Sequence, residues 1–249
     1  MLSLNRTLAG ILLYAFSVWC LPAVAADSAA SDSAQMRAVD PRMEARLPFA
    51  EVERRAAAGD TKAQAELGAR YGQGYGVAQD IPKAMAILSA AAAKNDPDAQ
   101  YFLGTAYASG LGVPQSDLQA FSLFEQAAAQ GHGPGSYMVA TSIIYGKAGI
   151  APSWKSGMKY LWDSAAKGYP PAMLLLGAAY QDGNGVDVNI KAAAYWYRRV
   201  LSYYQDVRAI YNLRILINKE LVAWEVGDPG EPPVATLRGP DTPAQGAKP

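Results

Sequence analysis

The chain has almost none of the side chains that build metal centres or carry acid–base catalysis at neutral pH. Its 249 residues include one cysteine, Cys20, and one histidine, His132. A structural zinc site needs four Cys or His ligands, so a site of that kind is excluded. A catalytic histidine needs an orienting partner, and a lone histidine between two glycines is typical of a solvent-facing or helix-capping residue. We therefore predict no metal site, no cofactor and no catalytic residue, in a protein that is not an enzyme.

An excess of either charge is also missing. Lys and Arg number 22, and so do Asp and Glu, which leaves a formal net charge of zero. Nucleic acids and anionic lipids attract proteins through an excess of positive charge. The balance therefore predicts a protein that binds no nucleic acid.

No apolar run is long enough to cross a bilayer. The longest, from Leu8 to Leu21, covers about 14 residues, whereas a spanning helix needs roughly 20. Arg6 precedes this run and the small-x-small sequence 23–25 follows it, as in a secretory signal peptide. We predict a signal peptide over 1–25, export to the periplasm and no membrane anchoring after cleavage. A transmembrane anchor is the alternative interpretation.

The single cysteine lies inside this predicted signal peptide. Trp19 stands directly before Cys20, where a lipoprotein signal requires a small residue, so lipidation is not expected. Cleavage after Ala25 would leave a mature chain without cysteine. Disulfides are then excluded, and the packed core alone must stabilise the exported protein.

The chain is rich in self-similarity, with a period of 36 to 37 residues. A small residue is followed four positions later by a bulky apolar one, and this occurs five times. Self-similarity at this period is typical of α-solenoids, in which each helix pair packs only against its neighbours. The pairs are Ala63/Leu67, Ala99/Leu103, Gly135/Val139, Ala172/Leu176 and Ala209/Leu213.

Each repeat reads as two helices joined by a glycine turn. In the second repeat, Ala99, Leu103 and Tyr107 recur every four residues and so share one helix face. Gly104 removes a side chain where we expect the second helix to cross the first. The turn after the first helix contains Gly110, and its two glycines permit positive φ.

The repeating residues resemble the Sel1-like repeat, a relative of the tetratricopeptide repeat. The period of 36 to 37 distinguishes them from the 34-residue tetratricopeptide unit. The third repeat departs from the pattern, with Ala140 and Ala148 at two glycine positions. The aromatic position of the second helix is assigned to Ile87, Leu123, Tyr160 and Tyr195. The first repeat carries the pattern most fully, in Ala63, Leu67, Gly68, Tyr71, Gly74, Gly76, Val77, Lys83, Ala84, Ala91 and Ala92.

The fold class predicted is all-α. The resemblance implies a right-handed α/α superhelix, or solenoid, of about four Sel1-like helix pairs, with capping helices at its N- and C-terminal ends. A disordered leader over 26–45 precedes the solenoid at 46–225, and a disordered Pro/Gly-rich tail follows at 226–249. The repeats are placed at 63–98, 99–134, 135–171 and 172–208, with a capping helix at 209–225.

A series of positions three residues after each small residue is the candidate binding surface. We expect first helices to line the concave side, where an apolar floor with a polar rim is typical of protein recognition. The alternative is that packing between neighbouring first helices buries these side chains. The series is Glu66, Phe102, Met138, Leu175 and Asn212. The predicted protein-binding residues are Glu66, Arg70, Phe102, Met138, Ser142, Tyr145, Leu175 and Asp182.

A solenoid presents an extended curved surface to other molecules, which predicts a binding protein, and the resemblance implies the same kind of role. We expect a periplasmic adaptor or regulator that holds another protein, of unknown identity, on its concave surface. The alternative is an immunity protein that neutralises a periplasm-targeted toxin effector such as a phospholipase.

Overall fold

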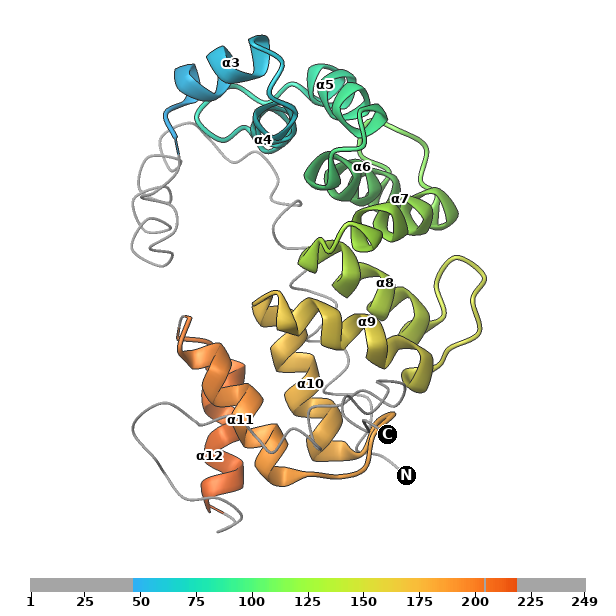
Figure 1. The fold of residues 1–249 in the computed structure, drawn as a ribbon, viewed down its shortest axis with the longest axis vertical. Helices are drawn as coiled ribbons and strands as arrows, with labels where there is room; N and C mark the ends of the chain where they lie inside the picture. The colour runs from blue at the N-terminus through green and yellow to red at the C-terminus, as the bar shows by residue number, and fades with distance from the viewer. Residues whose placement is uncertain (1–46, 204, 219–249) are drawn as a thin grey trace, which may run out of the picture. The chain divides into compact units, whose positions relative to one another are not determined.

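Ten helices and no strands are found in residues 47–203 and 205–218, the part of the chain that the computed structural model describes (Figure 1). The predicted all-α class is confirmed. Predictions for 1–25, 26–45 and 219–249 lie outside the described residues. The helices are α3 Phe49–Ala57, α4 Thr61–Gln73, α5 Ile81–Ala93, α6 Pro97–Ser109, α7 Asp117–Ala129, α8 Gly133–Tyr145, α9 Trp154–Ala166, α10 Pro170–Asp182, α11 Ile190–Leu201 and α12 Val207–Asn218.

Contacts divide the chain into two parts, Met1–Phe49 and Ala50–Pro249. In the second part, helices α4 to α12 pack against one another in chain order. Four helix pairs recur: α4 with α5, α6 with α7, α8 with α9, and α10 with α11. We call them units one to four, each with a first and a second helix. Every second helix also packs against the next first helix, and α4 contacts α6. This succession of pairs is the predicted solenoid (Figure 1).

The helices begin and end at residues suited to those places. The N-cap side chains of the second helices, at Asp80, Ser116, Ser153 and Asn189, each accept a hydrogen bond from the backbone N–H three residues later. Such caps stabilise a helix by about 1 kcal/mol each. Every first helix from α4 to α10 ends at a glycine in the left-handed conformation. These glycines are Gly74, Gly110, Gly146 and Gly183, with φ of 69°, 73°, 69° and 75°.

A glycine lets the two helices of a unit touch, as predicted for Gly104. A Cβ atom added to Gly104 would lie 2.7 Å from the Phe124 ring, which no real contact allows. Glycine therefore lets Phe124, only 2% exposed, lie flat against the backbone of α6. The same contact occurs in three units, between Gly68 and Leu88, Gly104 and Phe124, and Gly177 and Tyr197.

Unit three exchanges the small residues between its helices. Ala140 stands at the crossing position of α8, and Gly157 of α9 replaces the alanine that Ala120 represents in α7. A Cβ atom on Gly157 would lie 2.6 Å from Cγ1 of Ile144 and 3.0 Å from the Ala140 carbonyl oxygen. In unit three the residue without a side chain is therefore on the second helix, and its place is filled by the buried side chain of Ile144.

The turn between the two helices of unit three is one residue longer than the turns of the other units. The sequence of the third repeat also departs from the repeat pattern here. Ala148 takes the place of the second turn glycine and adopts φ of 55°, while Gly149 beside it has φ of 75°. An L-residue with a Cβ atom costs about 1–2 kcal/mol in this conformation. The loop therefore carries local strain at Ala148.

The aromatic position of unit four is Trp196, and the assignment to Tyr195 was wrong by one residue. Tyr197 packs on Gly177 as Leu88 packs on Gly68, which fixes the register of α11 against α5. Trp196 then corresponds to Ile87, and Trp196 is only 4% exposed. The run of three alanines at 192–194 hides this register in the sequence.

The last of the described helices, α12, is a first helix by its pattern, since Ala209 and Leu213 are buried. Its crossing position holds Arg214, which is exposed, where earlier first helices have Gly68, Gly104, Ala140 and Gly177. A second helix cannot approach α12 there as closely as in the other units. The exposed face of α12 is partly apolar, because Val207, Ile210 and Tyr211 are exposed at 78%, 40% and 64%.

We predict that Gly157→Ala destabilises the protein by about 1–3 kcal/mol, because the new methyl group overlaps Ile144. In an Ile144→Ala background the same change should cost less, since the overlap disappears and alanine favours the helix by about 1 kcal/mol. Urea unfolding of the four proteins, followed by circular dichroism, measures this coupling. Lys159→Ala, on the exposed face of α9, is the control and should show no coupling to Ile144. Equal destabilisation by Gly157→Ala in the wild type and in the Ile144→Ala background would show that Gly157 does not make space for Ile144.

We also predict that Ala148→Gly stabilises the protein by up to about 1 kcal/mol, because glycine removes the strain at positive φ and loses only part of that gain to unfolded-state entropy. The midpoint of urea unfolding of each variant, compared with that of the wild type, gives the change in stability. Ala151→Gly, in the same loop but without positive φ, should destabilise by about 0.4–1 kcal/mol. A loss of stability in Ala148→Gly would show that the loop is not strained.

Candidate functional site

The predicted binding series occupies equivalent positions on successive first helices, but its members differ in exposure. Glu66 on α4, Phe102 on α6 and Met138 on α8 are half-buried, as is Asn212 on α12. Leu175 on α10 is only 4% exposed and belongs to the core. The apolar series that a partner could touch without displacing core side chains is therefore Phe102 and Met138.

The polar members of the predicted set are also divided. Ser142 on α8 is buried, and Asp182 at the end of α10 is exposed. Arg70 is only 3% exposed, and its Nη2 lies 2.6 Å from Glu66 Oε1, one helical turn away. The guanidinium also lies 5.7 Å from the centroid of the Tyr75 ring. Arg70 thus neutralises Glu66, and the α4 end of the series carries little net charge.

Phe102 and Met138, the accessible apolar members of the series, pack against neighbouring side chains. The rings of Phe102 and Tyr101 are 5.4 Å apart, and Met138 packs against the core cluster that contains Phe124. Tyr145 contacts Trp154 edge-on at 6.5 Å. Its hydroxyl is buried and has no hydrogen-bond partner among the described residues, and burial raises the pKa of Tyr145 above the usual value.

His132 connects unit two to unit three and is a helix cap, one of the two roles predicted for it. Its Nδ1 accepts from the Gly135 backbone N–H at 3.0 Å, so the ring proton resides on Nε2. Nε2 donates to Asp98 Oδ1 at 3.0 Å, and the ring lies 5.2 Å from that of Tyr101. The His132 hydrogen bond lowers the pKa of Asp98 although burial acts in the opposite direction.

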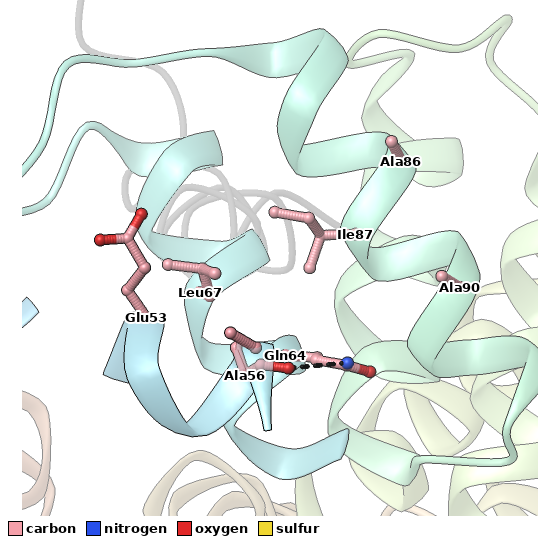
Figure 2. Close-up of a pocket in the computed structure, with 8 residues that line it drawn as sticks. Glu53, Ala56, Gln64, Leu67, Ala86, Ile87 and Ala90 are labelled. Carbon is pink, nitrogen blue, oxygen red and sulfur yellow. Dashed lines mark hydrogen bonds between the residues drawn. The ribbon is translucent and has the colours of Figure 1, made fainter. Parts of the chain in front are cut away.

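A second feature, missed by the sequence analysis, is an apolar hollow of about 400 Å³ between α3, α4 and α5. Figure 2 shows Leu67 of α4 and Ile87 of α5 pointing toward one another, with Glu53 of α3 at the border. Gln64 donates to the Ala56 carbonyl at 3.0 Å and accepts from Lys94 at 3.2 Å, so its amide is already engaged. Alanines complete the lining, at Ala56, Ala57, Ala86 and Ala90.

Neither surface has the composition of a catalytic centre. Across 47–203 and 205–218, no three His, Cys, Asp or Glu side chains gather closely enough to hold a metal ion. None of the helices in these ranges is long and apolar enough to cross a bilayer. The chemistry that both surfaces offer is apolar contact with a few hydrogen bonds at the border.

A model of the Sel1 repeat matches residues 61–96, 97–132 and 170–199. These ranges cover units one and two and most of unit four, and the chain therefore carries Sel1 repeats, as the sequence predicted. Unit three, whose departures include the Ala140/Gly157 exchange, lies between the matches. Sel1 repeats generally mediate protein–protein interaction, and proteins built from them are typically non-catalytic scaffolds.

Solved structures of Sel1-repeat proteins resemble the chain. A protective antigen of uropathogenic Escherichia coli with an SLR fold is 27% identical, with a TM-score of 0.61 over 70% of this chain and 37% of the antigen. A Sel1 repeat protein from Oxalobacter formigenes is 28% identical, with a TM-score of 0.62 over 69% of this chain and 49% of that one. The chain thus spans less than half of either protein. No curated protein matches the chain.

A third solved structure agrees in fold alone. A Sel1 repeat protein from Klebsiella pneumoniae is 22% identical, with a TM-score of 0.52 over 70% of this chain and 82% of that one. Together with the helix pairs, these structures confirm the predicted α-solenoid.

We predict that His132→Ala destabilises the protein by about 0.5–2 kcal/mol at pH 7, because α8 loses its cap. The pKa of Asp98 should rise toward its unfolded value of about 3.9. A depressed carboxyl pKa contributes stability above the unfolded value, and this contribution is lost as pH falls through the folded-state pKa. The variant should therefore lose less stability than the wild type on acidification below about pH 4.

Carboxyl titration by NMR and urea unfolding at several pH values test this prediction. Ser153→Ala is the matched control, because it removes the cap of α9 but leaves the partner of Asp98 in place. An Asp98 pKa unchanged by His132→Ala would show that the ring does not control the carboxylate.

Proposed function

With its repeats identified as Sel1 repeats, we propose that the chain is an exported adaptor or regulator that binds another protein through the exposed faces of its first helices. The signal-peptide pattern over 1–25 supports export to the periplasm.

The observation that supports this proposal is the position of Phe102 and Met138. They occupy equivalent places on α6 and α8, two first helices in contact, and both are half-buried. Side chains in this state offer apolar surface to a partner while their own packing holds them in place, which keeps the entropic cost of binding low.

The charged members of the predicted set indicate which charges on a partner would fit. Glu66 is neutralised by Arg70, and Asp182 lies exposed at the end of α10. An exposed carboxylate on a first helix favours a partner that carries a Lys or Arg as well as apolar side chains, although a pair this exposed adds little affinity. Affinity should therefore depend on Phe102 and Met138, and the charge should fix orientation.

We predict that Phe102→Asp combined with Met138→Asp reduces recovery of the partner about tenfold or more, because charge at the centre of an apolar contact removes hot-spot binding. The protein is affinity-purified from the periplasmic fraction, and co-purifying proteins are quantified by mass spectrometry. Circular dichroism checks that the variant is folded. Leu118→Asp is the matched control, since Leu118 is 69% exposed on the second helix α7 and lies outside the series.

The outcome separates the candidate roles. Loss of one partner in the double variant, with Leu118→Asp unchanged, supports the binding surface. A partner that is a toxic effector would favour the immunity role over the adaptor role. Unchanged recovery in the folded double variant would refute the surface, and absence of the protein from the periplasmic fraction would refute export.

A further inference from the structure

The hollow between α3, α4 and α5 has a counterpart between α9, α10 and α11. Comparison of the two sites indicates which kind of side chain the hollow can bind. The N-caps Asp80 and Asn189, 109 residues apart, set α5 equivalent to α11. The positive-φ glycines Gly59 and Gly168 set α3 equivalent to α9 by the same interval. Every residue around the hollow therefore has a defined equivalent in α9, α10 or α11.

Two indole rings occupy the equivalent space between units three and four. Trp162 of α9 stands at the place of Glu53, and Trp196 of α11 at the place of Ile87. Their ring centroids are 5.3 Å apart with an interplanar angle of 79°, an edge-to-face contact. Trp162 also lies edge-on to Tyr180 at 6.1 Å. This junction is thus packed by aromatic side chains from neighbouring second helices.

Smaller residues in unit one leave the same space open. Leu67 and its equivalent Leu176 are identical, so the base of the two sites does not differ. Around this base, Ile87 stands in place of Trp196 and Ala86 in place of Tyr195. The hollow of about 400 Å³ is what these replacements leave, and Figure 2 shows it open between Leu67 and Ile87.

The border of the hollow adds one polar preference. Glu53, at the place of Trp162, is exposed and brings a carboxylate beside the apolar lining. Gln64 cannot serve a ligand in its present position, because its amide bonds to Ala56 and Lys94. The acceptor available at the border is therefore the Glu53 carboxylate, which suits a flat aromatic group that carries an N–H donor.

We propose that this hollow binds the indole side chain of a tryptophan presented by a partner protein. The indole would lie between Leu67 and Ile87, as aromatic rings fill the equivalent junction between units three and four, and its N–H would donate to Glu53. The site shares no residue with the series around Phe102 and Met138, so it stands independently of the proposed function. It supplies a second contact at the α3 end of the solenoid.

The probe is N-acetyl-tryptophanamide, titrated into the full chain while the methyl signals of Leu67 and Ile87 are followed by NMR. We expect saturable shifts at both residues at millimolar concentration, as for a single side chain without the rest of a partner. Glu53→Gln should weaken binding of this probe about two- to tenfold, the effect of one hydrogen bond to a charged group, and leave N-acetyl-phenylalaninamide unaffected.

Filling the hollow provides the decisive variant. Ile87→Trp restores the residue found at the equivalent place in unit four, so it should abolish the Leu67 shift and raise the melting temperature. Leu123→Trp, at the same position of unit two, is the matched control and should leave binding unchanged. Ala90→Leu, an exposed lining residue, fills the hollow by a second route if Ile87→Trp does not fold.

Three results would overturn the proposal. The first is the absence of saturable shifts at Leu67 and Ile87. The second is equal binding of N-acetyl-leucinamide, which would make the hollow a general apolar contact. The third is unchanged binding in Ile87→Trp or Ala90→Leu.

Discussion

In each unit, the two helices can approach closely because a glycine at their contact has no side chain. The rest of the structure depends on that approach. Gly68, Gly104 and Gly177 allow Leu88, Phe124 and Tyr197 to lie against the backbone of the opposite helix. A methyl group there would force the helices apart in a close-packed interior. Unit three shows that the constraint belongs to the pair and not to one residue, because Gly157 of the second helix serves the same purpose beside Ala140. The helix pair is thus conserved in geometry within this chain while its sequence changes.

Because the backbone repeats, side chains at equivalent places can take different tasks without altering the fold. The N-cap of a first helix is a carboxylate at Asp60 and an imidazole at His132, and the imidazole additionally binds Asp98 of the preceding unit. The junction that Trp162 and Trp196 fill between units three and four is a hollow between α3 and unit one. Binding surfaces can therefore arise from substitution at single positions, since the stack of helix pairs holds their surroundings in place. The two surfaces described above lie in different places, since one follows the first helices and the other lies between α3, α4 and α5.

Much of the fold could be predicted from the sequence because its determinants are local. The period, the turn glycines and the crossing glycine Gly104 each act within one helix pair, and they fix the pair without reference to distant parts of the chain. Features that depend on several helices could not be predicted. Leu175 lies in the core and Phe102 does not, although both hold the same position of the repeat, because burial depends on how neighbouring units pack. The alanine run at 192–194 concealed that Trp196 is the aromatic residue of unit four. The hollow combines side chains of three helices, and no pattern along the sequence identifies it.

The arginine at the crossing position of α12 also bears on how such a chain can lengthen. Gene duplication adds whole helix pairs to solenoids, and a new pair must find compatible surfaces on both sides. A pair placed directly after α12 would meet Arg214 where close contact is required, whereas a pair inserted between α11 and α12 would meet the same surfaces that units two to four already present. Growth of this scaffold, in evolution or by design, is therefore easier between the described helix pairs than directly after α12.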